Sequence, residues 1–289
     1  MRTAKAAISG ATSSPGRAVA SLSALIGTFG TVTTALWSSI ILDDLLVAIV
    51  VVLIGSAAYF QPDWAVALIE WCQPEVVWRI PTKELRAALT IDDVPLLDWP
   101  TSFEEILDVL KENGVKATFF IMSGFTLPPS QGGMSEEKSN HCKRLLRRAV
   151  EEGHELGNHL QFDKPAFAMT HAEFETAFRH CDALLAEMAG GEDAWRGRSN
   201  RWFRPGSGLW TPHILSVASE AGYKTVLANC FPHDVSSISR HVNPLYLRWR
   251  VRVGSVIVVH DRWHTPNTLR ASLPSILRSG ISLGTLSSL

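Results

Sequence analysis

The chain has 289 residues, of which 46% are hydrophobic, with a formal net charge of −1 and a pI near 6.8. This length suits one large domain with an appendage, and a near-neutral charge without basic runs argues against a nucleic-acid partner. Four cysteines lie far apart without a Cys-x-x-Cys spacing, so we expect neither a disulfide framework nor a thiolate zinc site and interpret them as buried small residues: Cys72, Cys142, Cys181 and Cys230.

The N-terminal part differs in composition from the rest. A basic tail, residues 1–17, precedes two apolar runs at 18–42 and 45–60. A membrane helix needs about 20 apolar residues, so we expect 18–60 to form a membrane anchor of one or two helices. One span would carry the rest of the chain across the membrane, and a hairpin would return it to the side of the tail. A cleaved signal peptide is the alternative, but the leader before the second run is long for one.

After a linker at 61–82, the remaining residues, 83–289, alternate between short apolar runs and amphipathic stretches. This pattern predicts strands at 84–93, 116–122, 154–159, 201–206, 224–229, 254–261 and 281–289, and helices at 101–114, 135–152, 170–188, 211–222 and 264–280. Alternation of strands and helices gives a parallel sheet or barrel. Seven such units favour an incomplete (β/α) barrel over an open sheet.

Polar residues gather where the predicted strands end. Each group alone has an ordinary explanation, such as a helix cap, a turn or a core histidine. Their joint position at the carboxyl ends of strands matches the place where barrel enzymes build their sites. The groups are Asp92 with Asp93, His159 with Asp163, Arg204, and His260 with Asp261.

The stretch GHELGNHLQFDKP (153–165) first suggests a zinc-protease helix, which needs two histidines four residues apart. Here His154 and His159 are five apart, about 140° around a helix and on opposite faces of a strand, so they cannot share a metal. His159 and Asp163 are four apart just past the strand, and one helical turn would bring them to the same side. With Asp93 as a third ligand, positions remain for water and substrate.

Four segments, ALTIDDVP, GHELGNHLQFD, FRPGSG and GSVIVVHD, resemble the ordered motifs of the polysaccharide deacetylases, the NodB-homology domains of carbohydrate esterase family 4. The similarity extends from Leu89 to the C-terminus. It implies a distorted (β/α)7 barrel over 83–289, preceded by the hydrophobic helical segment.

The resemblance assigns roles to the first two motifs. It implies that Asp92 is the general base and that Asp93 binds a metal. The second motif implies two histidine ligands four apart, and the first is His159. The second falls on Asp163, a carboxylate where the family has an imidazole.

The third motif matches at Arg204 and Pro205, whereas Gly206 and Ser207 replace a proline and an aromatic residue. The resemblance implies that Arg204 orients the base and that the Ser207 N–H helps to hold the oxyanion. The aromatic wall of the sugar site is missing.

In the last motif, the resemblance implies that His260 is the general acid and that Val258 lines the acetyl pocket. Asp234 is the candidate for the acid that tunes the arginine or the histidine. Tryptophans near the motifs could supply a sugar-stacking surface instead of core: Trp202, Trp210 and Trp263.

These roles describe amide hydrolysis. A bound metal lowers the pKa of a water, Asp92 takes its proton, and His260 protonates the leaving amine. Two carboxylates and one imidazole make the cation less electrophilic than the usual set does. Zinc remains the expected ion, with cobalt, manganese or iron open.

The leading hypothesis is therefore a metal-dependent hydrolase that removes acetyl groups from N-acetylglucosamine polymers such as chitin, anchored to a membrane and working outside the cytoplasm or in a lumen, at the cell envelope. One alternative keeps the site and changes the substrate to a small amide or imide. The other is a non-catalytic glycan-binding protein with a degenerate metal site.

Overall fold

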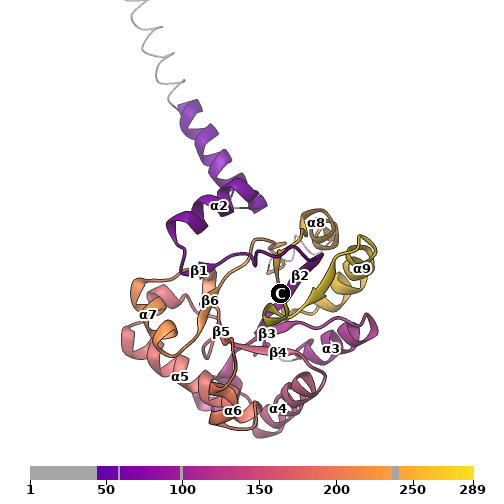
Figure 1. Ribbon diagram of the computed structural model, residues 1–289. Coiled ribbons are helices and arrows are strands. Elements are labelled where there is room, and N and C mark those ends of the chain that lie inside the picture. Colours follow the sequence, from indigo (N-terminus) through magenta and orange to yellow (C-terminus); the bar gives the residue numbers. More distant parts are fainter. Residues whose placement is uncertain (1–43, 58, 98–99, 236–240) are drawn as a thin grey trace, which may run out of the picture. The chain divides into compact units, whose positions relative to one another are not determined.

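The computed structural model describes residues 44–57, 59–97, 100–235 and 241–289 (Figure 1). The chain divides into two compact units, Met1–Phe60 and Gln61–Leu289. The basic tail and most of the expected membrane anchor lie outside the described residues. Within them, no helix combines the length and the apolar character that crossing a membrane requires.

The second unit is built on a curled sheet in which all pairs of strands are parallel. Seven strands follow the order β1-β6-β5-β4-β3-β2-β7, and β8 pairs with β2. The expectation of a distorted (β/α) barrel is confirmed (Figure 1). The strands are β1 (Val76–Val77), β2 (Arg86–Val94), β3 (Thr118–Ile121), β4 (Glu155–Asn158), β5 (Trp202–Phe203), β6 (Lys224–Val226), β7 (Val256–His260) and β8 (Ser282–Gly284).

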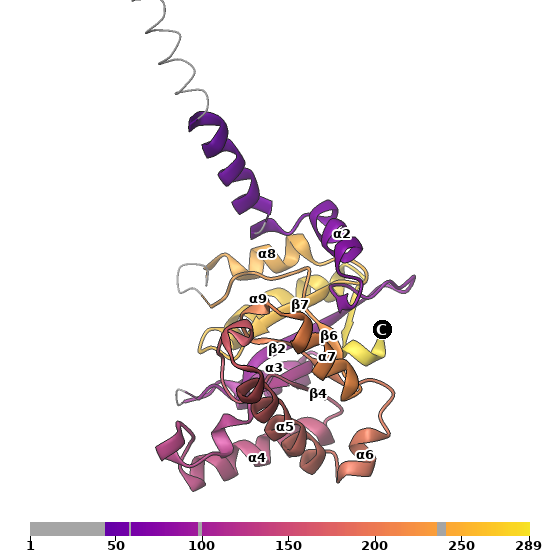
Figure 2. The same cartoon turned by 90° about the vertical axis from the view of Figure 1, so that its left-hand side faces the viewer.

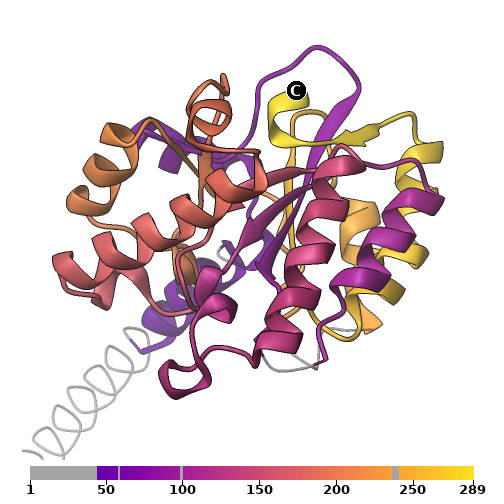
Figure 3. The same cartoon turned by 90° about the horizontal axis from the view of Figure 1, so that it is seen from below.

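Helices cover the outside of this sheet (Figures 1 and 3). The helices of this unit are α2 (Asp63–Cys72), α3 (Phe103–Glu112), α4 (Glu136–Glu151), α5 (His171–Met188), α6 (Glu192–Arg196), α7 (Pro212–Glu220), α8 (Asn243–Arg250) and α9 (Thr265–Arg278), of which α2 lies at the margin of the body. The five predicted helices correspond to α3, α4, α5, α7 and α9. The stretch 61–82, treated as a linker in the sequence analysis, contains α2 and β1.

Strand β2 is central to the sheet, since it pairs with β3, β7 and β8. All its residues after Arg86 are buried, which explains why its sequence is apolar on both faces until the two acids at its end. Leu89 and Ile91 belong to the main core, whereas Ala88 packs in a smaller cluster with Phe120.

The chain after β6 closes the barrel towards β7. Cys230 forms a parallel bridge with Ile257, and Val258 N–H donates to the Cys230 carbonyl over 3.0 Å. Cys142, Cys181 and Cys230 are buried as expected, but Cys72 is exposed at the end of α2, and all four are free thiols.

Candidate active site

The two aspartates at the end of β2 lie beside the end of β7. Asp92 is in register with His260, and the Asp261 N–H donates to the Asp92 carbonyl over 2.9 Å. Asp93 adopts a left-handed backbone conformation with φ 60°, where the sheet register between β2 and β3 shifts. A residue without glycine's freedom held at positive φ is a strained position of the kind found at functional sites.

Arg204 fixes the Asp92 carboxylate. Its Nη1 donates to Asp92 Oδ1 over 2.6 Å and to Thr90 Oγ1 over 2.7 Å, and its other nitrogens donate to the carbonyls of Val226 and Leu227. The guanidinium also lies over the Phe120 ring, 4.1 Å from its centroid. Burial lowers the pKa of Arg204, although the Asp92 charge beside it opposes that shift. The contacts therefore hold the Asp92 carboxylate in one orientation.

The predicted metal ligands come together. One potential ligand atom from each of Asp93, His159 and Asp163 lies within 4.8 Å of the others. The buried Asp93 Oδ1 accepts no hydrogen bond within the described part of the chain and lies 3.3 Å from His159 Nε2. His159 Nδ1 lies 2.7 Å from the Arg204 carbonyl, which can only accept, so this nitrogen carries the proton and Nε2 is left for a metal.

The charge states of Asp93 and His159 also favour the binding of a cation between them. Burial raises the pKa of Asp93, but the neighbouring His159 ring, together with the charges of His260 and Arg262, outweighs it and holds the pKa well below its usual range. Burial lowers the pKa of His159, and the Asp93 carboxylate reverses the direction to a raised pKa. A divalent cation between them would take the place of the imidazole proton. The residues present therefore fit a metal of the expected class.

Asp163 reaches this position through a loop and not through the helical turn expected from the sequence. Residues 159–165 contain no helix, with bends only at 161–163, and Leu160 has a positive φ of 65°. The Asn158 side chain accepts from Leu160 N–H over 2.9 Å and donates to the Phe178 carbonyl. Asp163 is exposed, whereas Asp93 and His159 are buried. A turn of backbone held by a buried asparagine therefore replaces the helix.

Arg262 contacts the site and was missed by the sequence analysis. Its Nη2 lies 2.7 Å from Asp93 Oδ2, the oxygen that does not face His159. The two residues are 169 positions apart, so no local pattern could have revealed the pair. The only signal was the position of Arg262 directly after the His260–Asp261 pair at the end of β7.

Asp261 is structural. It accepts from the N–H groups of Leu96 and Ser102 over 2.8 Å each and also from the Thr101 hydroxyl. The Thr101 hydroxyl in turn accepts from the N–H of Phe103, the first residue of α3, over 3.1 Å. Asp261 and Thr101 therefore both supply acceptors at the start of this helix.

His260 forms the other acid–base pair. Its Nδ1 lies 2.8 Å from Asp234 Oδ1, and its backbone N–H donates to Asp234 Oδ2 over 2.7 Å. Burial lowers the pKa of His260, but the Asp234 charge and hydrogen bond outweigh it, with smaller effects of Asp92 and Asp93, so the pKa rises to about 9. Since Nδ1 faces Asp234, Nε2 is the nitrogen that can reach a substrate. Asp234, named from the sequence, thus contacts the histidine.

The remaining candidates are placed as follows. Pro205 precedes the short turn Gly206–Gly208, in which Ser207 is exposed with φ 63°. Val258 is buried in β7. Trp210 is partly buried against Trp78, with ring centroids 6.2 Å apart.

Of the other tryptophans, Trp263 is exposed, but Trp202 is buried and its indole donates to Ser287 Oγ, so Trp202 cannot stack on a sugar. His154 accepts from Ala117 N–H and does not belong to the site, as the strand geometry predicted. Glu155 accepts from the Thr118 hydroxyl and lies outside the site as well.

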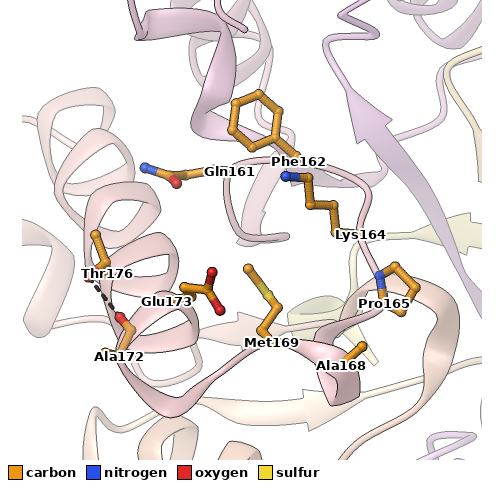
Figure 4. A pocket seen from close by; sticks show the side chains of 9 residues that line it. All are labelled: Gln161, Phe162, Lys164, Pro165, Ala168, Met169, Ala172, Glu173 and Thr176. Atoms are coloured by element: carbon orange, nitrogen blue, oxygen red, sulfur yellow. Dashed lines mark hydrogen bonds between the residues drawn. The ribbon is translucent and has the colours of Figure 1, made fainter. Parts of the chain in front are cut away.

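A hollow of about 570 Å³ lies between the loop that carries Asp163 and helix α5 (Figure 4). Its lining contains Phe162, Lys164, Met169 and Glu173, and Lys164 Nζ lies 5.3 Å from the Phe162 ring centroid. None of the acid–base residues lines this hollow, so it is separate from the catalytic constellation.

The polysaccharide deacetylase family model matches residues 79–226, just over half of the chain. The chain belongs to this family. The match covers β2 to β6 with Asp92, Asp93, His159 and Arg204. The enzyme class inferred from the motifs, hydrolysis of a non-peptide carbon–nitrogen bond, is that of the family. The peptidoglycan-N-acetylglucosamine deacetylase of Bacillus cereus is 27% identical over 225 residues, 74% of this chain and 92% of that protein. A chitooligosaccharide deacetylase of Bradyrhizobium is 29% identical over 178 residues, 60% of this chain and 69% of that protein.

Solved structures support the same fold. A peptidoglycan N-acetylglucosamine deacetylase in complex with 4-naphthalen-1-yl-N-oxidanyl-benzamide superposes with a TM-score of 0.62 at 22% identity, covering 76% of this deacetylase-family chain and 94% of the other. A family pseudoenzyme from Bacillus anthracis superposes with a TM-score of 0.59 at 18% identity, covering 74% and 68%. The fold therefore occurs in both active and inactive relatives, and activity has to be argued from the site.

Proposed function

We propose that this protein removes the acetyl group from N-acetylglucosamine residues of a cell-envelope glycan by metal-dependent amide hydrolysis. The family membership supports the reaction class, and the relatives named for peptidoglycan and chitooligosaccharides support N-acetylglucosamine as the sugar. The balanced reaction consumes one water and yields acetate and the free amine.

Asp92 is the general base in this proposal. Its carboxylate is buried, and the Arg204 guanidinium fixes its direction through a contact of 2.6 Å. Held in this orientation, the carboxylate can accept a proton from the attacking water. Thr90 Oγ1 shares the same guanidinium nitrogen, so the base is held by a network anchored in β2 and the carbonyls after β6.

Asp93, His159 and Asp163 would hold the divalent cation, and zinc, cobalt and manganese are the ions to test. When bound, such an ion supplies Lewis acidity towards a water and towards the acetyl carbonyl oxygen. Arg262 donates to Asp93 Oδ2, so Oδ1 would be the oxygen available to the ion.

His260 is the general acid. Its raised pKa means that it is protonated near neutral pH, and Asp234 holds Nδ1 so that Nε2 can pass a proton to the leaving nitrogen. The protonated acid and the ionised base stand in register at the ends of adjacent strands. A carboxylate fixed by Arg204 and a histidine held by Asp234, facing each other across two strand ends next to a fitting ligand set, are the observation on which the proposal rests.

The test is acetate release by the purified full chain, loaded in turn with zinc, cobalt or manganese, from chitin oligomers, from peptidoglycan and from a panel of small amides. Asp92→Asn should reduce the rate at least about a hundredfold, because the base is lost while the shape is kept. Asp193→Asn, an exposed aspartate of α6, is the matched control and should not change the rate.

Each other outcome selects a different function. Equal activity of Asp92→Asn would overturn the mechanism. Activity on small amides alone would fit the missing aromatic residue at Ser207 and replace the glycan substrate. Sugar binding without acetate release would indicate a non-catalytic protein, as in the pseudoenzyme of the same fold.

A further inference from the structure

Helix α2 presents an apolar face to solvent. Trp64, Leu68 and Trp71 follow the spacing i, i+4, i+7, which places them on one side of a helix. The two tryptophans are 67% and 80% exposed, and Leu68 is exposed as well. Val66, the buried residue of this helix, belongs to a different side. Large aromatic side chains left in water on one face of a short helix indicate a binding surface.

Helix α8 presents a similar face. Leu245 and Trp249 are four residues apart and both exposed, the tryptophan to 57%. Tyr246 and Leu247, which follow Leu245, are buried in the core. One side of α8 therefore packs in the core, and Leu245 and Trp249 are exposed on the surface.

The two helices are tied together within the same compact unit. The Arg250 guanidinium at the end of α8 lies 3.0 Å from the Asp63 carboxylate at the start of α2 and also donates to the Gln61 carbonyl. Arg79 holds Glu70 of α2 through its Nε at 3.0 Å. Both helices lie along the same margin of the body in two perpendicular views (Figures 1 and 2).

The charges near these side chains favour a negatively charged partner. Both acids of α2 are engaged by arginines, Asp63 by Arg250 and Glu70 by Arg79. Beside Trp249, the exposed Arg248 and Arg252 add positive charge. Tryptophan with neighbouring arginine is the composition that settles at the boundary between lipid headgroups and acyl chains.

The position in the sequence points to the same partner. The apolar run 45–60 ends directly before Gln61, and its described side chains from Leu45 to Ile54 are exposed. A lipid surface is the environment that would accept this run and the α2 face consecutively along the chain.

We propose that the tryptophan face, formed by Trp64, Leu68, Trp71, Leu245 and Trp249, docks the catalytic body onto the headgroup region of an anionic lipid bilayer. This contact is distinct from any insertion of the N-terminal segment and independent of the deacetylase chemistry. It would keep the active site at a fixed orientation close to the membrane surface, where substrate attached to or formed at the membrane is reached first.

The experiment measures partition of the full-length protein onto vesicles of phosphatidylcholine with or without phosphatidylglycerol. The variant Trp64→Ser/Trp71→Ser/Trp249→Ser should bind the anionic vesicles at least about tenfold more weakly than the wild type, because three interfacial side chains are lost. Phe167→Ser/Leu85→Ser, which removes two exposed apolar side chains from elsewhere, should bind like the wild type. Arg248→Gln/Arg252→Gln should weaken binding to phosphatidylglycerol vesicles more than to pure phosphatidylcholine.

Cys72 offers a direct reporter, because it is the exposed thiol at the end of α2 and the other three are buried. An environment-sensitive fluorophore on Cys72 should shift to the blue when anionic vesicles are added. Unchanged partition of the triple variant together with an unshifted label would overturn the proposal. Loss of self-association in place of lipid binding would also overturn it, by making the face a contact between copies.

Acetate release from soluble chitin oligomers separates this proposal from the previous one. The triple variant should retain the wild-type rate, because none of its residues belongs to the site. If no variant and no wild type shows hydrolysis, the lipid measurements still decide the docking.

Discussion

The Asp163 carboxylate adds a second negative charge to the ligand set, and Arg262 supplies a compensating positive one. Asp93 and Asp163 contribute −2, and Arg262, 2.7 Å from Asp93, returns +1. The net charge around the ion is then the same as for one carboxylate with two imidazoles and no arginine. The extra negative charge that Asp163 brings in place of a histidine is therefore balanced by Arg262, which follows β7.

Replacing Asp163 with histidine should test this balance. In Asp163→His, the positive charge of Arg262 would no longer be balanced by a second carboxylate. The site should then bind a divalent ion at least about tenfold more weakly. The acid limb of the rate profile should move to lower pH by about one unit. Competition with a zinc chelator measures the affinity. If neither the wild type nor Asp163→His holds a stoichiometric divalent ion, the site is not a metal site.

The pH dependence on the alkaline side should belong to His260. The general acid works when protonated, and its pKa is raised to about 9, so activity should fall as the pH rises through about 9. Asp234→Asn removes the charge that raises this pKa and leaves burial, which lowers it. The alkaline limb should then move down by about two units or more.

The profile of kcat/KM against pH for Asp234→Asn and for Asp193→Asn checks this expectation.

The raised pKa of His260 also has a consequence for stability. A folded pKa above the unfolded value of about 6.5 stabilises the protein below pH 6.5, and this contribution is lost as the pH rises through about 9. If the alkaline limb of the kcat/KM profile does not move in Asp234→Asn, that limb reflects the titration of a group other than His260.

The loop from His159 to Pro165 is the element that decides whether the ligands meet. It is held on one side by Gly124, whose N–H donates to the Gln161 carbonyl over 2.8 Å, and on the other by Gly206. A Cβ at Gly206 would lie 2.2 Å from the Lys164 carbonyl oxygen, next to Asp163. Glycine in the third motif is thus a spatial requirement of this loop.

Gly206→Ala should push the Lys164 carbonyl away and move Asp163 with it. We expect metal affinity to fall about tenfold or more and the free energy of unfolding to fall by about 1–3 kcal/mol. Gly208→Ala is the control, because its φ of 64° makes alanine strained, but the nearest atom, on Leu227, is 3.9 Å away. It should lower stability without changing metal affinity. Equal metal affinity of Gly206→Ala and the wild type would show that the loop adapts.

The limits of sequence-based prediction are visible at the same scale. Elements with long, clear patterns were predicted because their own residues determine them: β2 by its continuous apolar run and α5 by its helical period. The two-residue β1 and the five-residue α6 have too few positions to show a period. The ligands were found through their motifs, but Arg262 and the Asp261 cap act across about 160 residues and exist only once β7 lies beside β2.

The molecule as a whole depends on contacts that close the barrel at both margins. At the C-terminus, the Thr118 hydroxyl accepts a hydrogen bond from Leu286 N–H, and the Glu155 carboxylate accepts one from Ser287 N–H. At the N-terminal end of the unit, β1 completes the sheet beside β6, and Ile80 N–H donates to the Gly254 carbonyl over 2.9 Å. Residues before the recognisable motifs therefore contribute to the fold.

The start of the catalytic domain can be located by truncation. A chain beginning at Lys83 loses β1, with the burial of Val76, and leaves β6 paired only with β5. Its free energy of unfolding should be lower by about 3 kcal/mol or more than that of a chain beginning at Gln61. A chain beginning at Gln73 keeps β1 and should lie close to the longer one. Urea unfolding of the three chains measures the difference. Equal midpoints and slopes for all three would mean that β1 contributes nothing, and the domain would begin at the motifs themselves.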